Sequence, residues 1–309
     1  MSASLLVHIP AEGNARSGVE ELVRLLVEEA DGVFETLRFD TEHLDNWQRW
    51  LEEHAPDVAR MVNGAPSDSE FRGAEQLGRA FVRSFADEDA EVATKALAET
   101  TREMYRSARL PSETMGASSA LHDALADPVL PDEQRRSMIR CMYGVLIATA
   151  GEFELPLQEF ADPATAGTNA ADRRLRAIAT EVATPDTLRF KIWNDCLDLL
   201  RARSRTMALA VDSAESLTSV SGNGLVLIRG SESYAPILVL ANPTSDVIEV
   251  SIDRRLLPVN IGKTFRDEIT GDMLFLPYGG DNCLSVDLEP YEVMWLSLRP
   301  EPEEERLLQ

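Results

Sequence analysis

Two periods of hydrophobic residues divide the chain near residue 205. Before that point, apolar residues recur every three or four positions, as in the segment 17–30, and this spacing predicts helices. Beyond Ser204 apolar and polar residues alternate, which is the period of a strand. The pattern predicts an α/β part over 1–205, an all-β part over 206–299 and an acidic tail over 300–309.

In the α/β part, helical segments stand between short apolar runs. The predicted strands cover 5–8, 33–39, 58–62 and 144–149. The predicted helices cover 17–30, 44–55, 132–143, 171–182 and 186–204, and the stretch 70–109 is helical throughout. Because strand, helix and strand follow one another repeatedly, we expect a parallel sheet.

The all-β part contains short strands that are separated by turn signals. We expect strands at 224–229, 235–241, 247–252, 282–286 and 293–298. Gly, Asn, Asp and Pro mark turns at 221–224, 242–243, 270–272 and 279–281. This arrangement predicts an antiparallel β-sandwich.

Charge is the most distinctive feature of the composition. The chain has 53 acidic and 30 basic side chains, a net charge of -23, and only Lys95, Lys191 and Lys263 as lysines. Such a surface repels nucleic acids and anionic membranes. It is typical of proteins adapted to high salt, and equally of an acidic protein from an arginine-favouring genome.

The sequence offers few residues that could bind a cofactor or a metal ion. Cys141, Cys196 and Cys283 lie far apart without histidine at ligand spacing, so we expect buried thiols, no disulfide framework and no metal site. Glycine-rich phosphate-binding motifs are absent from the sequence, and we predict no cofactor. No run of eighteen apolar residues occurs and the N-terminus lacks signal-peptide features, so we expect a cytoplasmic protein.

The C-terminal residues resemble the β-sandwich that closes enzymes of the α-amylase family, glycoside hydrolase family 13. The similar features come in order: a helix at 192–204, a strand ending in an exposed loop at 226–230, the segment 241–244, a turn at 267–271 and the motif Leu-x-Pro-Tyr-x-x-x-Trp-Leu at 288–296. The resemblance implies that residues 1–205 form a (β/α)8-type barrel. Only one predicted strand precedes 33–39, so we expect this barrel to be partial or rebuilt.

The resemblance also implies candidate residues for a sugar site. Retaining glycosidases use a nucleophilic carboxylate and an acid/base carboxyl group about 5–5.5 Å apart. Arg38-Phe39-Asp40 ends a predicted strand and is similar to the family's nucleophile motif, with Asp40 as the nucleophile and Arg38 and His43 in the substrate pocket. This stretch resembles that of maltose-1-phosphate maltosyltransferases and glycogen-debranching enzymes. The alternative is a surface salt bridge between Arg38 and Asp40.

The remaining family carboxylates are less well matched. Where the resemblance implies the acid/base glutamate, the sequence has Asn63-Gly64, and Glu70 is the nearest glutamate. Asparagine cannot supply the proton that the leaving oxygen needs. His122-Asp123 resembles the third-acid motif, with Asp123 as the acid and His122 in the pocket, although its setting is helical. Gly151-Glu152-Phe153-Glu154 resembles the end of the eighth strand, and Glu152 or Glu154 is a second source of the proton.

The four histidines, His8, His43, His54 and His122, show no paired ligand spacing, and from spacing alone we expect each to be a structural or surface residue. Three hypotheses follow. The first is a catalytically impaired amylase-like protein that binds an α-glucan, a sugar phosphate or another glucosyl metabolite, or supports an active partner. The second is an active retaining α-glycosyl hydrolase or transferase with Asp40 as its nucleophile. The third is a structural protein that mediates homo- or hetero-oligomeric assembly.

Overall fold

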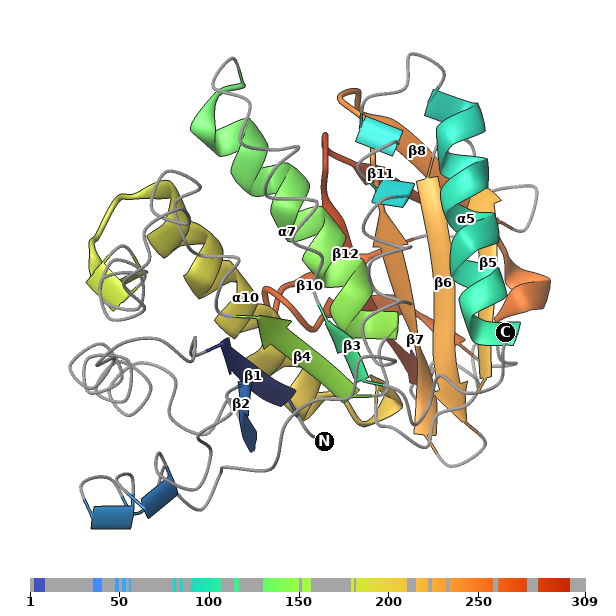
Figure 1. Cartoon of the computed structure of the whole chain (residues 1–309). Coiled ribbons are helices and arrows are strands. Elements are labelled where there is room, and N and C mark those ends of the chain that lie inside the picture. The colour runs from blue at the N-terminus through green and yellow to red at the C-terminus, as the bar shows by residue number, and fades with distance from the viewer. Residues whose placement is uncertain are drawn as a thin grey trace.

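The computed structural model describes part of the 309-residue chain. The described residues are 3–8, 36–40, 48–49, 52–53, 56, 80–81, 84–85, 90–106, 114–116, 130–149, 152–156, 179–180, 182–209, 215–221, 224–231, 234–257, 261–276 and 283–300. They form a parallel sheet, three long helices and an antiparallel sandwich (Figure 1).

The parallel sheet has four strands in the order β2-β1-β4-β3. The strands are β1 (Ala3–His8), β2 (Thr36–Asp40), β3 (Thr114–Gly116) and β4 (Glu152–Pro156). Strand β1 pairs with β2 on one side and with β4, the last strand of this sheet in chain order, on the other. The predicted strand at 5–8 is confirmed, and so is the part 36–39 of the strand predicted at 33–39, whose residues 33–35 lie outside the described residues. The strand β3 was not predicted.

Three long helices lie in the described residues. They are α5 (Ala90–Arg106), α7 (Asp132–Thr149) and α10 (Leu188–Arg205). The helix predicted at 186–204 and the helical character of 90–106 are confirmed. Gln48, Arg49, Glu52 and Glu53 are helical as predicted, and Pro56 is also helical, although the helix was expected to end before it. The segments 17–30 and 58–62 lie outside the described residues.

The strand predicted at 144–149 is wrong, because these residues are the last turns of α7. From Cys141 to Thr149 every residue is buried. A short apolar run that is buried on all sides has no periodicity that separates a strand from a helix. The helix therefore continues six residues past the predicted end, Tyr143.

Side chains from elsewhere in the chain bind the carbonyl groups at the end of α7. Arg203 Nη1 donates to the Ile147 carbonyl oxygen (2.8 Å), and Arg229 Nη1 to that of Ala148 (2.5 Å). The last carbonyls of a helix lack partners within it and carry partial negative charge, so two guanidinium groups there stabilise the helix end.

The sandwich consists of a six-stranded sheet, β10-β9-β12-β7-β6-β5, and a two-stranded sheet, β11-β8. The strands are β5 (Glu215–Ser221), β6 (Gly224–Ser231), β7 (Tyr234–Ala241), β8 (Ile248–Asp253), β9 (Ile261–Asp267), β10 (Met273–Phe275), β11 (Cys283–Leu288) and β12 (Val293–Pro300). All pairings are antiparallel. The predicted antiparallel sandwich is confirmed, although β5, β9 and β10 were not predicted.

Both faces of the large sheet are buried at its centre. One face packs against β8 and β11, with Val226, Leu240 and Leu296 in the shared core. The helices α5 and α7 and the 3-10 turn Met207–Leu209 cover the other face, which carries Leu227, Val239 and Trp295 (Figure 1). Strands that are buried on both sides are apolar at successive positions. This explains the unbroken apolar runs in β6 and β7.

Three further expectations concern particular residues. Trp193 and Trp295 are fully buried, and Cys141 and Cys196 are buried free thiols, as predicted, whereas the free thiol Cys283 on β11 is only partly buried. The exposed loop expected at the end of 226–230 is wrong: β6 runs on to Ser231, and a Cβ on Gly230 would lie 2.7 Å from the Pro236 Cα atom.

Candidate functional site

The C-terminal edge of the parallel sheet brings His8 and Asp40 together. His8 is the last residue of β1, Asp40 is the last residue of β2, and the two are register partners. Partners on neighbouring strands have Cα atoms about 4.8 Å apart. In α/β folds this is the edge at which ligands bind.

Backbone alternation divides the four strands into a polar and an apolar face. The register places His8, Arg38, Asp40, Glu152 and Glu154 on one face, together with Ser4, Leu6, Thr36, Thr114, Gly116 and Pro156. The opposite face carries Leu5, Val7, Leu37, Phe39, Met115, Phe153 and Leu155. All ionisable residues of the described sheet thus share one face, as expected of a sheet with one apolar packing side.

The two glutamates lie far from Asp40 on this face. Glu154 is level with Ser4, four residues before the level of His8 and Asp40, and β1 separates β4 from β2. Two strand spacings and four residues along the strands separate the Cα atoms of Asp40 and Glu154 by about 16 Å, and two strand spacings and six residues separate those of Asp40 and Glu152 by about 22 Å. An aspartate and a glutamate that extended fully toward each other would shorten either distance by about 8 Å, given three and four bonds of about 1.5 Å from the Cα atom to the carboxyl oxygen. Neither pair reaches the 5–5.5 Å of retaining enzymes.

The reason is that Glu152 and Glu154 begin β4. The family resemblance implied that they end that strand, but β4 continues to Pro156. Of the other predicted site residues, His43, Glu70, His122 and Asp123 lie outside the described residues.

His8 lies at the same edge of the sheet as Asp40, although the sequence predicted it to be a structural or surface residue. Its signal in the sequence is its place at the end of the apolar run 5–7, which is the place that Asp40 has after its own strand. Only the register shows that the two strand ends are neighbours.

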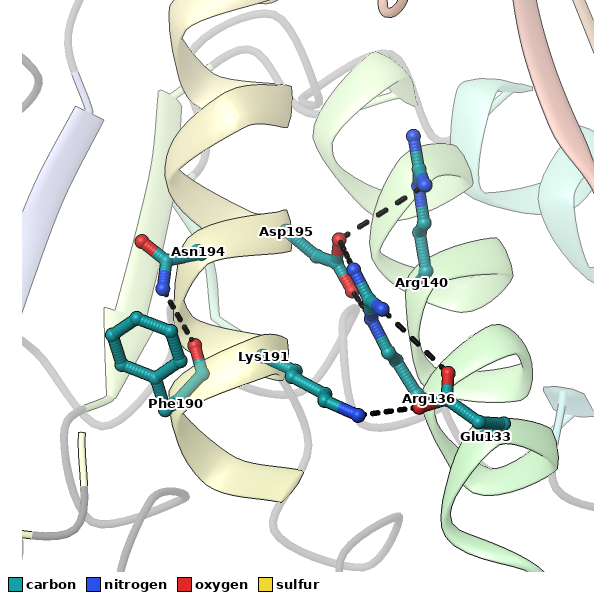
Figure 2. A network of polar contacts seen from close by, with 7 residues as sticks. All are labelled: Glu133, Arg136, Arg140, Phe190, Lys191, Asn194 and Asp195. Carbon is teal, nitrogen blue, oxygen red and sulfur yellow. Dashed lines mark hydrogen bonds and ion pairs between the residues drawn. The ribbon is translucent and has the colours of Figure 1, made fainter. Parts of the chain in front are cut away.

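A second polar cluster joins α7 to α10 (Figure 2). Arg136 donates to Asp195 twice, from Nε to Oδ2 at 2.7 Å and from Nη2 to Oδ1 at 2.9 Å, and Arg140 Nη1 lies 4.0 Å from Oδ1. Lys191 pairs with Glu133, which also faces Arg136 at 3.6 Å. The hydrogen bond from Lys191 holds the pKa of Glu133 below its usual value. The hydrogen bonds that Arg136 donates to Asp195 raise the pKa of the Arg136 guanidinium. Each of these charged side chains has a partner of opposite charge, and the pairs hold α7 and α10 together.

A third cluster of polar residues lies between α7 and the sandwich. Asn242 is fully buried; its Nδ2 donates to the carbonyls of Asp246 (2.7 Å) and Glu289 (2.8 Å), and its Oδ1 accepts from the Thr244 backbone (2.9 Å). Half-buried Glu292 has a raised pKa, chiefly because burial disfavours its charge, and burial likewise raises the pKa of the Cys141 thiol. A thiol held protonated in this way is a poor nucleophile and a poor metal ligand.

Within the part of the chain that the structure describes, no group of three or more His, Cys, Asp or Glu residues could hold a metal ion. None of the described helices is long and apolar enough to span a bilayer.

No family model matches the sequence, and no curated protein matches it. Solved structures do match. AmyP in complex with maltotriose superposes with a TM-score of 0.55 at 12% identity, over 92% of this chain and 68% of that one. The α-amylase from Geobacillus thermoleovorans complexed with acarbose gives 0.53 at 16% identity, over 91% and 63%. The debranching enzyme from Nostoc punctiforme gives 0.50 at 13% identity, over 91% and 62%.

These matches concern architecture. This chain spans between 56% and 68% of the length of the similar structures. Its parallel sheet followed by an antiparallel sandwich is the order of elements that the sequence resemblance implied. Over more than nine tenths of its length, the chain therefore shares the fold of α-amylases and a debranching enzyme.

Proposed function

We propose that this protein binds an α-glucan or a glucosyl metabolite at the C-terminal edge of its parallel sheet and does not hydrolyse it. Asp40 is the central binding residue, and Arg38 lines the same site; His43, His122 and Asp123 are the further residues that the family resemblance implies. The observation that carries the proposal is the in-register pairing of Asp40 with His8 at the ligand-binding edge of an amylase-type fold.

The glucan class comes from the similar structures. Their ligands are maltotriose, maltose and acarbose. A carboxylate, a guanidinium and an imidazole are suited to the same chemistry, because sugar hydroxyls both donate and accept hydrogen bonds.

Two observations support impaired catalysis. Asn63-Gly64 stands where the family's acid/base glutamate is implied. Glu152 and Glu154 are separated from Asp40 by distances that exceed the retaining range. Glu70 is the carboxylate on which an active enzyme would depend, and activity with Asp40 as nucleophile is the second candidate function.

A thermal-shift screen tests the proposal. The ligands are maltose, maltotriose, trehalose, sucrose, glucose 1-phosphate and maltose 1-phosphate, and the variants are Asp40→Asn and Asp287→Asn. Asp287 is exposed on β11 of the sandwich and is the matched control. A ligand that binds only the folded state raises the unfolding midpoint.

We expect a shift with at least one sugar that Asp287→Asn keeps and Asp40→Asn loses. Release of reducing sugar or phosphate from the bound ligand, abolished in Asp40→Asn and in Glu70→Gln, would support the active enzyme instead. No shift with any sugar would support the structural assembly role.

A further inference from the structure

We infer that the outer edge of β10 is the contact surface of a reversible homodimer. In this dimer β10 of a second copy of the chain pairs with β10 of the first in antiparallel orientation, about a two-fold axis at Leu274. The contact extends the large sheet of the sandwich across two molecules.

The backbone of β10 has one side bonded to β9 and one side turned outward, because β10 is the last strand of its sheet. Leu276 N–H donates to the Lys263 carbonyl of β9 at 2.8 Å, and the Asp272 carbonyl accepts from β9 at 2.9 Å. Backbone groups of an antiparallel strand alternate in direction from residue to residue. Those of Met273 and Phe275 therefore point away from β9, toward the position of a further strand.

The side chains of these two residues are large, apolar and exposed. Met273 is 60% exposed and Phe275 is 68% exposed, more than any other large apolar residue that the structure describes. They share one face of β10, whereas Leu274 between them packs against the core of the sandwich. Soluble proteins commonly protect a sheet edge with charged side chains, and the residues of β10 carry no charge. This edge is typical of one that pairs with another strand.

The edge is complementary to itself. With Leu274 on the two-fold axis, Met273 of one copy lies opposite Phe275 of the other, and the axis repeats this pairing. The outward backbone groups of these two residues then form hydrogen bonds on both sides of the axis, in the pattern of an antiparallel ladder. The exposed apolar side chains of the two copies cover one another.

Charge complementarity favours a second copy as the partner. Leu276 is level with Lys263 on β9, and in the dimer it lies opposite Asp272 of the second copy. Asp272 and Lys263 of different copies are then two strand spacings apart, about 10 Å between Cα atoms, on the same face. A lysine and an aspartate that extend toward each other bridge this distance, and both side chains are exposed in the single chain. The opposite charges attract locally, although each copy has a net charge of -23.

The size of the contact determines its strength. Given about 200 Å² for a fully exposed side chain, Met273 and Phe275 contribute roughly 250 Å² from each copy. The total of roughly 500 Å² is below the about 1,200 Å² at which stable interfaces begin. We therefore expect a dimer that forms reversibly and only at high protein concentration.

Sedimentation of the full chain between about 5 and 500 µM tests for this weak dimer. We expect the average mass to rise with concentration from 34.2 kDa toward twice that value. Phe275→Lys should weaken the association at least about tenfold, because a charge on an edge strand opposes pairing. Val247→Lys is the matched control: Val247 is 59% exposed on the same sandwich, and its replacement should leave the association unchanged.

Charge exchange tests the two-fold register. Asp272→Lys makes the net charge less negative and so reduces the general repulsion between copies, yet we expect about threefold weaker association because the pair with Lys263 is lost. Lys263→Glu should also weaken the dimer. The double variant restores the pair with the signs exchanged and keeps the net charge, so it should recover the association of the unaltered protein.

Amide exchange locates the pairing strand. We expect the Met273 and Phe275 amides to exchange more slowly at high than at low protein concentration. The Leu276 amide is the internal control, because it is bonded to β9 in the single chain already.

A chain that remains monomeric up to about 500 µM overturns the inference, and this outcome needs no variant to fold. Association that folded Phe275→Lys retains in full also overturns it, since the contact would then lie elsewhere. Failure of the double variant to recover the association overturns the pairing about Leu274.

Discussion

Arg136 and Asp195 are 59 residues apart in the sequence and form a bidentate ion pair between α7 and α10 (Figure 2). The Asp195 side chain is 9% exposed, and that of Arg136 is 32% exposed. Breaking a buried pair leaves an uncompensated charge, which costs about 3–5 kcal/mol, less where solvent reaches one partner. This pair is the strongest polar link between the two helices among the described residues.

We expect Asp195→Asn to lower the free energy of unfolding by about 2 kcal/mol, because Arg136 and Arg140 lose their shared carboxylate. Glu133→Gln is the control: it removes the exposed pairs of Glu133 with Lys191 and Arg136, which should cost clearly less than the loss of Asp195. Urea unfolding measures both. Equal costs would show that burial does not strengthen the Arg136–Asp195 pair.

Gly144 lets α7 approach β12 closely. A Cβ atom at this position would lie 2.6 Å from Val293 Cγ1 and 2.8 Å from Cγ2. We expect Gly144→Ala to destabilise the protein by about 1–2 kcal/mol, since overpacking outweighs the better helix propensity of alanine. In a double-mutant cycle, Val293→Ala should cost less in the Gly144→Ala background than alone. Additive effects would contradict the close contact.

The amide of Asn242 ties the end of β7 to the turns before β8 and β12. We expect Asn242→Asp to cost about 3 kcal/mol, because a carboxylate oxygen would face the carbonyls of Asp246, Leu288 and Glu289 in place of an N–H donor. Asp246→Asn is the matched control, since Asp246 contributes its backbone carbonyl to this network. Thermal unfolding compares the two, and similar midpoints would contradict this role of Asn242.

Glu292 gives a pH-dependent prediction. Its folded-state pKa is raised, mainly by burial, so ionisation of Glu292 lowers stability as the pH rises from the unfolded pKa of about 4.5 through the folded pKa. Glu292→Gln should raise the melting temperature at pH 7 by the order of 1 °C. The gain should vanish below the unfolded pKa, where the glutamate is protonated in both states. A gain that is independent of pH would have another cause.

Much of the sandwich could be predicted from the sequence, because its turns carry Gly, Asn, Asp and Pro and its inner strands are apolar. β9 escaped prediction because Gly262, Lys263, Thr264 and Arg266 interrupt its apolar positions, and Phe265 is its deeply buried residue. The end of α7 was not predicted because residues 144–149 are all buried and therefore show no helical periodicity. The arginines that stabilise this end, Arg203 and Arg229, bind it across 56 and 81 residues, which no local pattern reports.

The candidate site could be predicted only in part. The position of Asp40 at the end of a strand followed from the apolar run before it. Which strand lies beside β2 depends on sheet order, and that order brings in His8 and leaves Glu152 and Glu154 at the other end of the sheet. Strand order depends on contacts between segments far apart in the chain, so the local patterns of the sequence do not report it.

Calorimetric titration of maltotriose into the unaltered protein, Asp40→Asn and Asp287→Asn, with a parallel assay for released glucose and maltose, tests the central proposal most directly. We expect the unaltered protein and Asp287→Asn to bind maltotriose without cleaving it, and Asp40→Asn to bind it at least about tenfold more weakly, the loss of roughly one charge-assisted hydrogen bond. Unchanged affinity in folded Asp40→Asn, or turnover of the bound sugar, would contradict a binding site built on Asp40 that lacks catalysis.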